Sequence, residues 1–133
     1  MAAETRVPIR ADPDIVIARQ QGRALAATLA LSTSDLTLIA AAISEVARNI
    51  LTYARSGEIE LLVVQEGNRQ GIVVIARDAG PGISNIPQAM QDGYTTGNGL
   101  GLGLPGAKRL MDEFEVVSAP GEGTTVTMKK WAR

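Results

Sequence analysis

The sequence predicts an α/β protein in which three helices cover one face of a mixed, mostly antiparallel sheet, as a two-layer sandwich. Apolar residues recur at helical spacing in the first half of the chain, and β-branched residues then gather in short runs between glycine-containing turns. With 133 residues, of which 45% are hydrophobic, the chain can bury one core. We therefore expect a single domain over residues 1–133.

The chain is expected to begin with a strand and a helix. Residues Thr5–Ile9 alternate weakly, which favours a short strand or an extended arm. Asp12 is a good N-cap and Pro13 suits the first position of a helix. Apolar spacing extends this first helix to about Ala30.

A second helix should follow directly. Ser32 and Asp35 have the spacing of a capping box, and the helix should end near residues 54–57. Its apolar face consists of Leu36, Ile39, Ala40, Ile43, Ala47, Ile50 and Leu51.

The period then changes from helical to extended. Residues Ile59–Gln65 and Ile72–Ala76 are β-branched runs on either side of a short turn, which predicts an antiparallel pair. A third helix fits Gly103–Met111. The last hairpin should pair Glu115–Ser118 with Thr124–Trp131.

The composition excludes several classes of function. Histidine and cysteine are absent, which excludes zinc-hydrolase sites, Ser-His-Asp triads, cysteine nucleophiles and a phospho-accepting histidine. A net charge of -1 leaves no basic field for nucleic acid, and no segment is apolar and long enough to span a membrane. The expectation is therefore a cytoplasmic protein that binds neither nucleic acid nor membrane.

Glu45 and Asn49 form the first chemically suggestive pair. They are four residues apart, so they share one face of the second helix, roughly opposite its apolar stripe. Such a pair is common on solvated helix faces. A carboxylate and an amide oxygen together can also supply a base and a ligand for Mg²⁺, which prefers oxygen ligands.

Two groups of glycines lie where a ligand could bind, one after a predicted strand and one at the beginning of the third helix. Asp78 ends a predicted buried strand, and Gly80 and Gly82 follow it, which allows a ligand to approach the backbone closely. Three more glycines precede the third helix, where backbone N–H groups and the helix N-terminus favour phosphate: Gly99, Gly101 and Gly103.

Two further motifs have simpler interpretations. Residues 101–106 match the dinucleotide fingerprint G-x-G-x-x-G, but no strand is predicted before them, so we reject that interpretation. Thr124, in the segment Gly123-Thr124-Thr125, would by itself indicate only a hairpin turn.

Together, these motifs occur in the order of the N box, the two glycine boxes and the terminal threonine motif of one ATPase superfamily. The chain resembles this superfamily, which DNA gyrase, Hsp90, histidine kinases and MutL share, from about Ser32 to Trp131. Within it, residues 43–49, 92–96 and 104–114 resemble the small serine/threonine kinases of bacterial sigma-factor pathways, above all the stressosome switch kinases. The resemblance implies the Bergerat ATP-binding fold.

The resemblance also implies a role for each residue, with ATP and Mg²⁺ as cofactors. Asn49 would hold Mg²⁺, and Glu45 would deprotonate the attacking hydroxyl. Asp78 would accept a hydrogen bond from the adenine amino group, with Thr124 nearby. The remaining roles concern the glycines: Gly80 and Gly82 would leave room for the nucleotide, and Gly99, Gly101 and Gly103 would bind its phosphates.

The predicted lid, residues 84–98, departs from several superfamily members because it contains no Lys or Arg. Charge on the transferred phosphoryl group would then be neutralised by Mg²⁺, by the third helix, or by a side chain such as Arg48 or Lys108.

The implied substrate is a small STAS-domain protein of the stressosome or anti-anti-sigma type. A PP2C-type phosphatase or a sigma factor would be a further partner. The alternative function is a nucleotide-gated binding protein that sequesters a sigma factor or activates a phosphatase. An intact Glu45 favours the kinase, because a pure binding protein has no use for a base.

Overall fold

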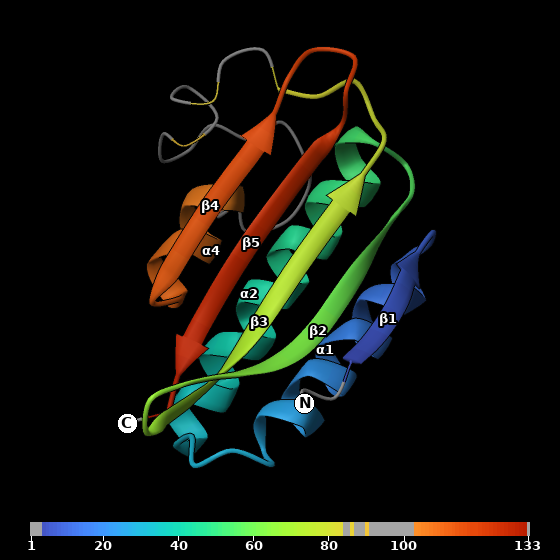
Figure 1. Cartoon of the computed structure of the whole chain (residues 1–133). Helices are drawn as coiled ribbons and strands as arrows, with labels where there is room; N and C mark the ends of the chain where they lie inside the picture. The colour runs from blue at the N-terminus through green and yellow to red at the C-terminus, as the bar shows by residue number, and fades with distance from the viewer. Residues whose placement is uncertain (1–3, 84–85, 87–89, 91–102, 133) are drawn as a thin grey trace.

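Five strands and three helices make up the described chain (Figure 1). The computed structural model describes residues 4–83, 86, 90 and 103–132. The elements, in order, are β1 (Glu4–Ile9), α1 (Asp12–Ala26), α2 (Thr33–Tyr53), β2 (Gly57–Glu66), β3 (Arg69–Asp78), α4 (Gly103–Leu110), β4 (Glu113–Ser118) and β5 (Thr124–Trp131).

The five strands form one sheet in the order β1-β2-β3-β5-β4. All four strand pairings in the described chain are antiparallel. This confirms the predicted, mostly antiparallel sheet, and the described strands form no parallel pair. The register matters at one end of the sheet. Asp78, the last residue of β3, lies opposite Gly57 of β2 on one side and Thr124 of β5 on the other.

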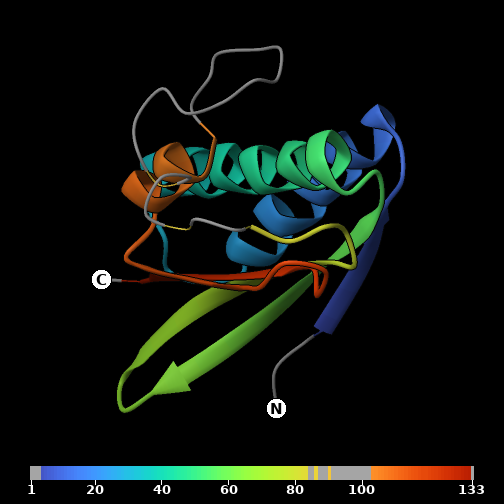
Figure 2. The same cartoon turned by 90° about the horizontal axis from the view of Figure 1, so that it is seen from above.

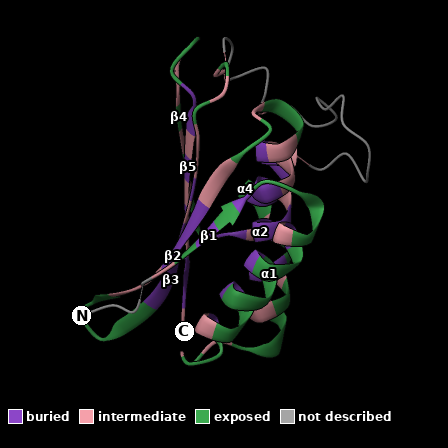
Figure 3. Ribbon diagram, turned by 90° about the vertical axis from the view of Figure 1, so that its right-hand side faces the viewer, coloured by how far each residue is buried: buried purple, intermediate pink, exposed green. Residues whose placement is uncertain are grey.

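The three helices cover one face of this sheet, as predicted (Figures 2 and 3). α2 is central and packs against α1, α4 and the strands. The largest fully buried side chains come from the apolar faces of α2 and of the strands: Ile9, Ile39, Ile43, Ile50, Ile59, Leu61, Ile72, Met128, Val46 and Val74. No helix within the described ranges is long and apolar enough to cross a membrane.

The boundaries of α1 differ from the expectation at both ends. Ala11 is the N-cap rather than Asp12, and the Asp14 carboxylate accepts hydrogen bonds from the backbone N–H groups of Arg10 and Ala11. The helix ends at Ala26, because both the N–H and the hydroxyl of Thr28 donate to the carbonyl of residue 25 and tighten the last turn.

α2 begins as predicted, and several later boundaries are shifted. β2 and β3 extend beyond the predicted runs at both ends. The Ser32 hydroxyl accepts from the Asp35 N–H at 3.0 Å, whereas the Asp35 carboxylate forms an ion pair with Lys130. α4 ends at Leu110, one residue early. β4 begins two residues early, at Glu113, because that residue already pairs with Lys129 of β5.

The sheet face that the helices leave uncovered carries a buried acid. The side chain of Glu60 is only 6% exposed, because Arg77 donates a hydrogen bond to it at 2.7 Å and Arg6 lies 3.6 Å away. The hydrogen bond to Glu60 raises the pKa of Arg77 above its usual value. Charge pairing therefore accounts for the burial of this carboxylate.

Candidate functional site

Glu45 projects from the middle of α2 toward the beginning of α4. Its Oε1 accepts a hydrogen bond from the backbone N–H of Gly103 at 3.2 Å, and Arg48 Nη1 lies 3.4 Å from its Oε2. The side chain of Glu45 is only 12% exposed. The helical wheel placed it opposite the core, but α4 packs against α2 there and covers it. The acid of the N box and the last glycine of the second glycine box are therefore in contact.

Asn49 lies one turn further along α2, on the same face as Glu45. Its side chain is half-buried and forms no hydrogen bond within the described part of the chain. An available amide oxygen suits Mg²⁺ as a single protein ligand, because this ion takes few protein ligands and completes its shell with waters and phosphates. The residues present therefore fit this ion.

Asp78 lies where β3 ends, beside the C-terminal end of α2 (Figure 1). Its Oδ1 accepts from the N–H of Gly80 at 2.9 Å, and its Oδ2 accepts no hydrogen bond from the described residues. Because Asp78 and Thr124 are directly opposed on adjacent strands, their side chains share the helix-covered face. The structure thus brings together the acid of the first glycine box and the terminal threonine.

The glycines after β3 lie in close contact with other parts of the chain. A Cβ on Gly80 would stand 2.5 Å from Cβ of Ala54, just beyond α2. Gly82 has φ of 78°, and a Cβ there would clash with the carbonyl oxygen of Ala119. Both glycines were predicted to leave room for a nucleotide, and that role stays a prediction. In the structure they also let the strand-end turn pack tightly between α2 and the β4–β5 turn.

Ser118, the last residue of β4, is a site-forming residue that sequence reasoning missed. Its hydroxyl accepts from the N–H of Ile83 at 2.8 Å, lies 2.8 Å from the hydroxyl of Thr124, and donates to the carbonyl oxygen of Gly123 at 2.8 Å. It therefore links the first glycine box to the terminal threonine motif. The signal available was indirect: a hairpin register that pairs residue 118 with residue 124.

Several predicted residues lie outside the described chain or apart from the site. Gly99, Gly101 and the predicted lid fall outside the described residues, except for positions 86 and 90. Gly103 opens α4 with φ of 56°, in the left-handed region that favours glycine. Of the two candidate cations, Arg48 lies beside Glu45, whereas Lys108 is exposed near the far end of α4.

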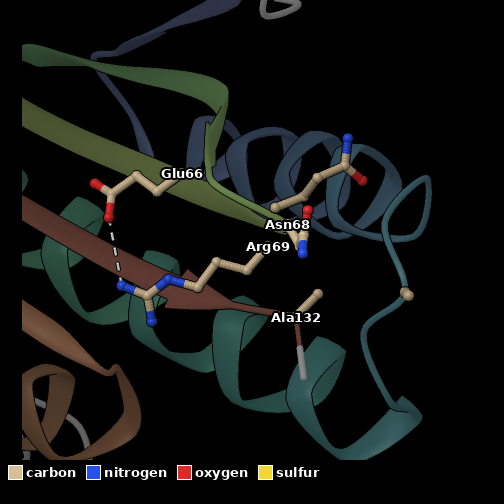
Figure 4. A pocket seen from close by; sticks show the side chains of 6 residues that line it. Glu66, Asn68, Arg69 and Ala132 are labelled. Atoms are coloured by element: carbon tan, nitrogen blue, oxygen red, sulfur yellow. Dashed lines mark hydrogen bonds and ion pairs between the residues drawn. The ribbon is translucent and has the colours of Figure 1, made fainter.

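A separate depression of about 530 Å³ lies at the opposite end of β3 from Asp78 (Figure 4). Its wall includes the ion pair between Glu66 and Arg69, and the Arg69 guanidinium also stacks 3.9 Å from the centre of the Trp131 ring. None of the predicted site residues that the structure describes lines it. This depression is therefore separate from the cluster that contains Asp78 and Thr124.

The chain is similar to several known proteins. Residues 9–130 match the family described as "Histidine kinase-like ATPase domain". The serine/threonine-protein kinase RsbT of Bacillus subtilis (strain 168) is 48% identical over 133 residues, covering the whole of both chains. An anti-sigma F factor of Thermoanaerobacter sp. (strain X514) is 35% identical over 120 residues, covering 86% of this chain and 82% of that protein.

Two solved structures share the fold. A structure of the RsbU and RsbW domains of Rv1364c from Mycobacterium tuberculosis superposes with a TM-score of 0.63 at 21% identity, covering 98% of this chain and 32% of that one. The mycobacterial sensor histidine kinase MprB gives 0.54 at 16% identity, covering 98% and 99%. The predicted two-layer α/β fold is therefore confirmed.

Proposed function

Because the chain belongs to the histidine kinase-like ATPase domain family, we propose that it transfers phosphate from ATP to a serine or threonine of a partner protein. The chain is a serine/threonine-protein kinase of the partner-switching type, as its full-length similarity to RsbT indicates. The observation that best supports the mechanism is the hydrogen bond between the Glu45 carboxylate and the Gly103 N–H. It joins a base to the N-terminus of a helix, where phosphate binds favourably.

Adenine would be recognised at Asp78. Oδ1 is held by the N–H of Gly80, which orients the carboxylate and leaves Oδ2 to accept from the exocyclic amino group of adenine. Thr124, directly across the strand pair, would support the same base through its hydroxyl. Guanine carries a carbonyl oxygen at this position, which would face the carboxylate acceptor to acceptor.

Phosphoryl transfer would take place between α2 and α4. The N–H groups at the beginning of α4, with those of Gly99 and Gly101, would bind the phosphates. Glu45 would accept the proton of the substrate hydroxyl while that oxygen bonds to the γ-phosphorus and the bond to the ADP oxygen breaks. Arg48, 3.4 Å from Glu45, is the described cation best placed to offset charge on the transferred group.

Asn49 would hold Mg²⁺ through its amide oxygen. The ion supplies positive charge to the triphosphate when it is bound. The role of the chain is to present that oxygen on the same helix face as Glu45, so that the metal ligand and the base keep a fixed spacing.

The substrate that we propose is a small STAS-domain protein of the stressosome or anti-anti-sigma type. A phosphate formed next to Glu45 and Asp78 would repel those carboxylates and weaken the complex. The released kinase could then bind a second partner, either a PP2C-type phosphatase or a sigma factor. Because such a pathway uses cellular ATP, we propose that the protein acts in the cytoplasm.

A nucleotide-gated binding protein is the second candidate. The similarity to anti-sigma F factors favours it, because their name describes an inhibitor of a sigma factor. The two functions are compatible, since a kinase can also sequester the partner that it does not phosphorylate.

The test is phosphorylation of candidate partners with γ-labelled ATP, followed by acid treatment of the product. We expect acid-stable label on the STAS-domain protein, because a serine or threonine ester survives acid and a phosphoramidate does not. A parallel pull-down with and without ATP separates catalysis from binding. Acid-labile label, or ATP-dependent capture of a partner without label, would contradict the kinase assignment.

A further inference from the structure

Lys130 is a buried cation for which the proposed mechanism has no direct use. It lies on β5, and its side chain is only 9% exposed, on the helix-covered face of the sheet. A buried ammonium group is costly unless it is paired and hydrogen-bonded. The contacts around the Lys130 ammonium group must therefore compensate for its burial.

The ammonium group of Lys130 contacts both helices that form the site. Nζ donates a hydrogen bond to the carbonyl oxygen of Leu110 at 2.9 Å, and Leu110 is the last residue of α4. The same Nζ lies 3.8 Å from Oδ1 of Asp35, in the first turn of α2. A third contact, also at 3.8 Å, is made with Asp112 just after α4.

The contact with Leu110 satisfies a helix end. The last carbonyl groups of a helix lack partners within the helix and carry partial negative charge, so a cation there is favourable. Asp112 is itself fixed to β5, because its Oδ2 accepts from the N–H of Trp131 at 2.8 Å. The C-terminal end of α4 is thereby held against the sheet.

Both ends of α4 are consequently tied to α2. The N-terminal end is tied through Gly103 and Glu45, and the C-terminal end through Lys130 and Asp35. The spacing is consistent: eight residues of α4 span about 12 Å, and the ten-residue step along α2 spans about 15 Å. α4 thus runs antiparallel to α2 between two fixed points.

We propose that Lys130 is a positioning residue for phosphoryl transfer: by clamping the C-terminal end of α4, it fixes where the N-terminal N–H groups of α4 meet the ATP phosphates and Glu45. This inference rests on the proposed function, because it requires α4 to bind phosphate. A short helix held at one end only would tilt or slide along α2. Its phosphate-binding end would then lose its alignment with the base.

The experiment compares Lys130→Met with Lys129→Met in the full-length protein. Methionine keeps the aliphatic stem and removes the charge. Lys129 is the adjacent lysine, and its side chain points to the uncovered sheet face, where it approaches Glu113 at 3.9 Å. Affinities for ATP and for adenosine, which lacks phosphates, are measured with each variant. Transfer is measured with the labelled-ATP assay.

Lys130→Met should lower kcat/KM by roughly 10- to 100-fold, the range expected when a reacting group is misplaced by about 1 Å. ATP affinity should fall while adenosine affinity stays near the wild-type value, because the adenine contacts lie at Asp78. Lys129→Met should match the wild type in all three measurements. Lys130→Arg, which restores a cation, should recover part of the loss.

Equal losses of ATP and adenosine affinity, or unchanged transfer in folded Lys130→Met, would overturn the role of Lys130. If Lys130→Met does not fold, Asp35→Asn removes one charge from the clamp with little change in shape and should show a smaller loss of the same kind. An unchanged ATP-to-adenosine affinity ratio in that variant would equally overturn it. If the wild-type protein binds no ATP, that result would instead contradict the proposed kinase function itself.

Discussion

Replacing Glu45 by glutamine should separate the chemistry of the site from its stability. Glutamine keeps the length of the side chain and an oxygen that can still accept from the Gly103 N–H. It loses the ion pair with Arg48, whose side chain is 43% exposed. Exposed ion pairs contribute about 0.2–1 kcal/mol, and making a charged hydrogen bond neutral costs roughly another 1 kcal/mol. The free energy of unfolding should therefore fall by about 2 kcal/mol at most.

The loss of phosphoryl transfer should be much larger than this change in stability can explain. Removing a general base lowers the rate by about 10²-fold or more, which is roughly 2.7 kcal/mol of activation free energy. A domain with about 5 kcal/mol of stability that loses 2 kcal/mol remains about 99% folded. The population of folded enzyme would then change by about one per cent.

Three measurements test this prediction: urea unfolding, ATP affinity by calorimetry, and transfer of label from γ-labelled ATP to the partner. Glu122→Gln is the matched control, because Glu122 is an exposed glutamate in the β4–β5 turn. We expect the Glu45 variant to bind ATP and to transfer poorly, and the control to match the wild type. Normal transfer by folded Glu45→Gln would refute the assignment of Glu45 as the base.

Three further predictions follow from the same end of the sheet. ATP should bind roughly tenfold or more tightly than GTP, because losing a charged hydrogen bond costs about 1.5–3 kcal/mol. Asp78→Asn should weaken ATP binding with an unchanged circular dichroism spectrum. Equal affinities for both nucleotides would contradict the role of Asp78 in adenine recognition. Gly80→Ala should lower the free energy of unfolding, measured by urea titration, by about 1–3 kcal/mol, because the new Cβ would stand 2.5 Å from Cβ of Ala54. Adding Ala54→Gly should recover part of this loss. Ser118→Ala should cost about 1–3 kcal/mol by the same measurement, because the Ile83 N–H loses its acceptor; a change within error would show that water replaces the hydroxyl.

Periodicity and turn chemistry in the sequence determined most of the fold. The apolar face of α2, the β-branched runs of β2 and β3 and the glycine turns are local signals, and they predicted these elements and the layer arrangement. Helix ends were less predictable. Aspartate is a favoured N-cap residue, so Asp12 was a reasonable prediction. In the structure it is the Asp14 carboxylate that accepts hydrogen bonds from the N–H groups of Arg10 and Ala11.

The order of the motifs along the chain, together with the family resemblance, singled out Glu45, Asn49, Asp78 and Thr124 as predicted site residues. What the sequence could not supply were the contacts between residues far apart in the chain. Glu45 and Gly103 are 58 positions apart, and only the packing of α4 on α2 brings them within 3.2 Å.

The same limit explains the glycines and the buried lysine. Gly80 was predicted to leave room for a nucleotide. Tertiary packing adds a second reason for a small residue there, because Ala54, 26 positions earlier, lies against it. Lys130 looks in the sequence like any lysine of a C-terminal strand. Strand register turns its side chain toward the helices, and only there do the end of α4 and the first turn of α2 converge on one ammonium group. Local patterns determine which elements form, while the relative placement of distant elements decides what their side chains contact.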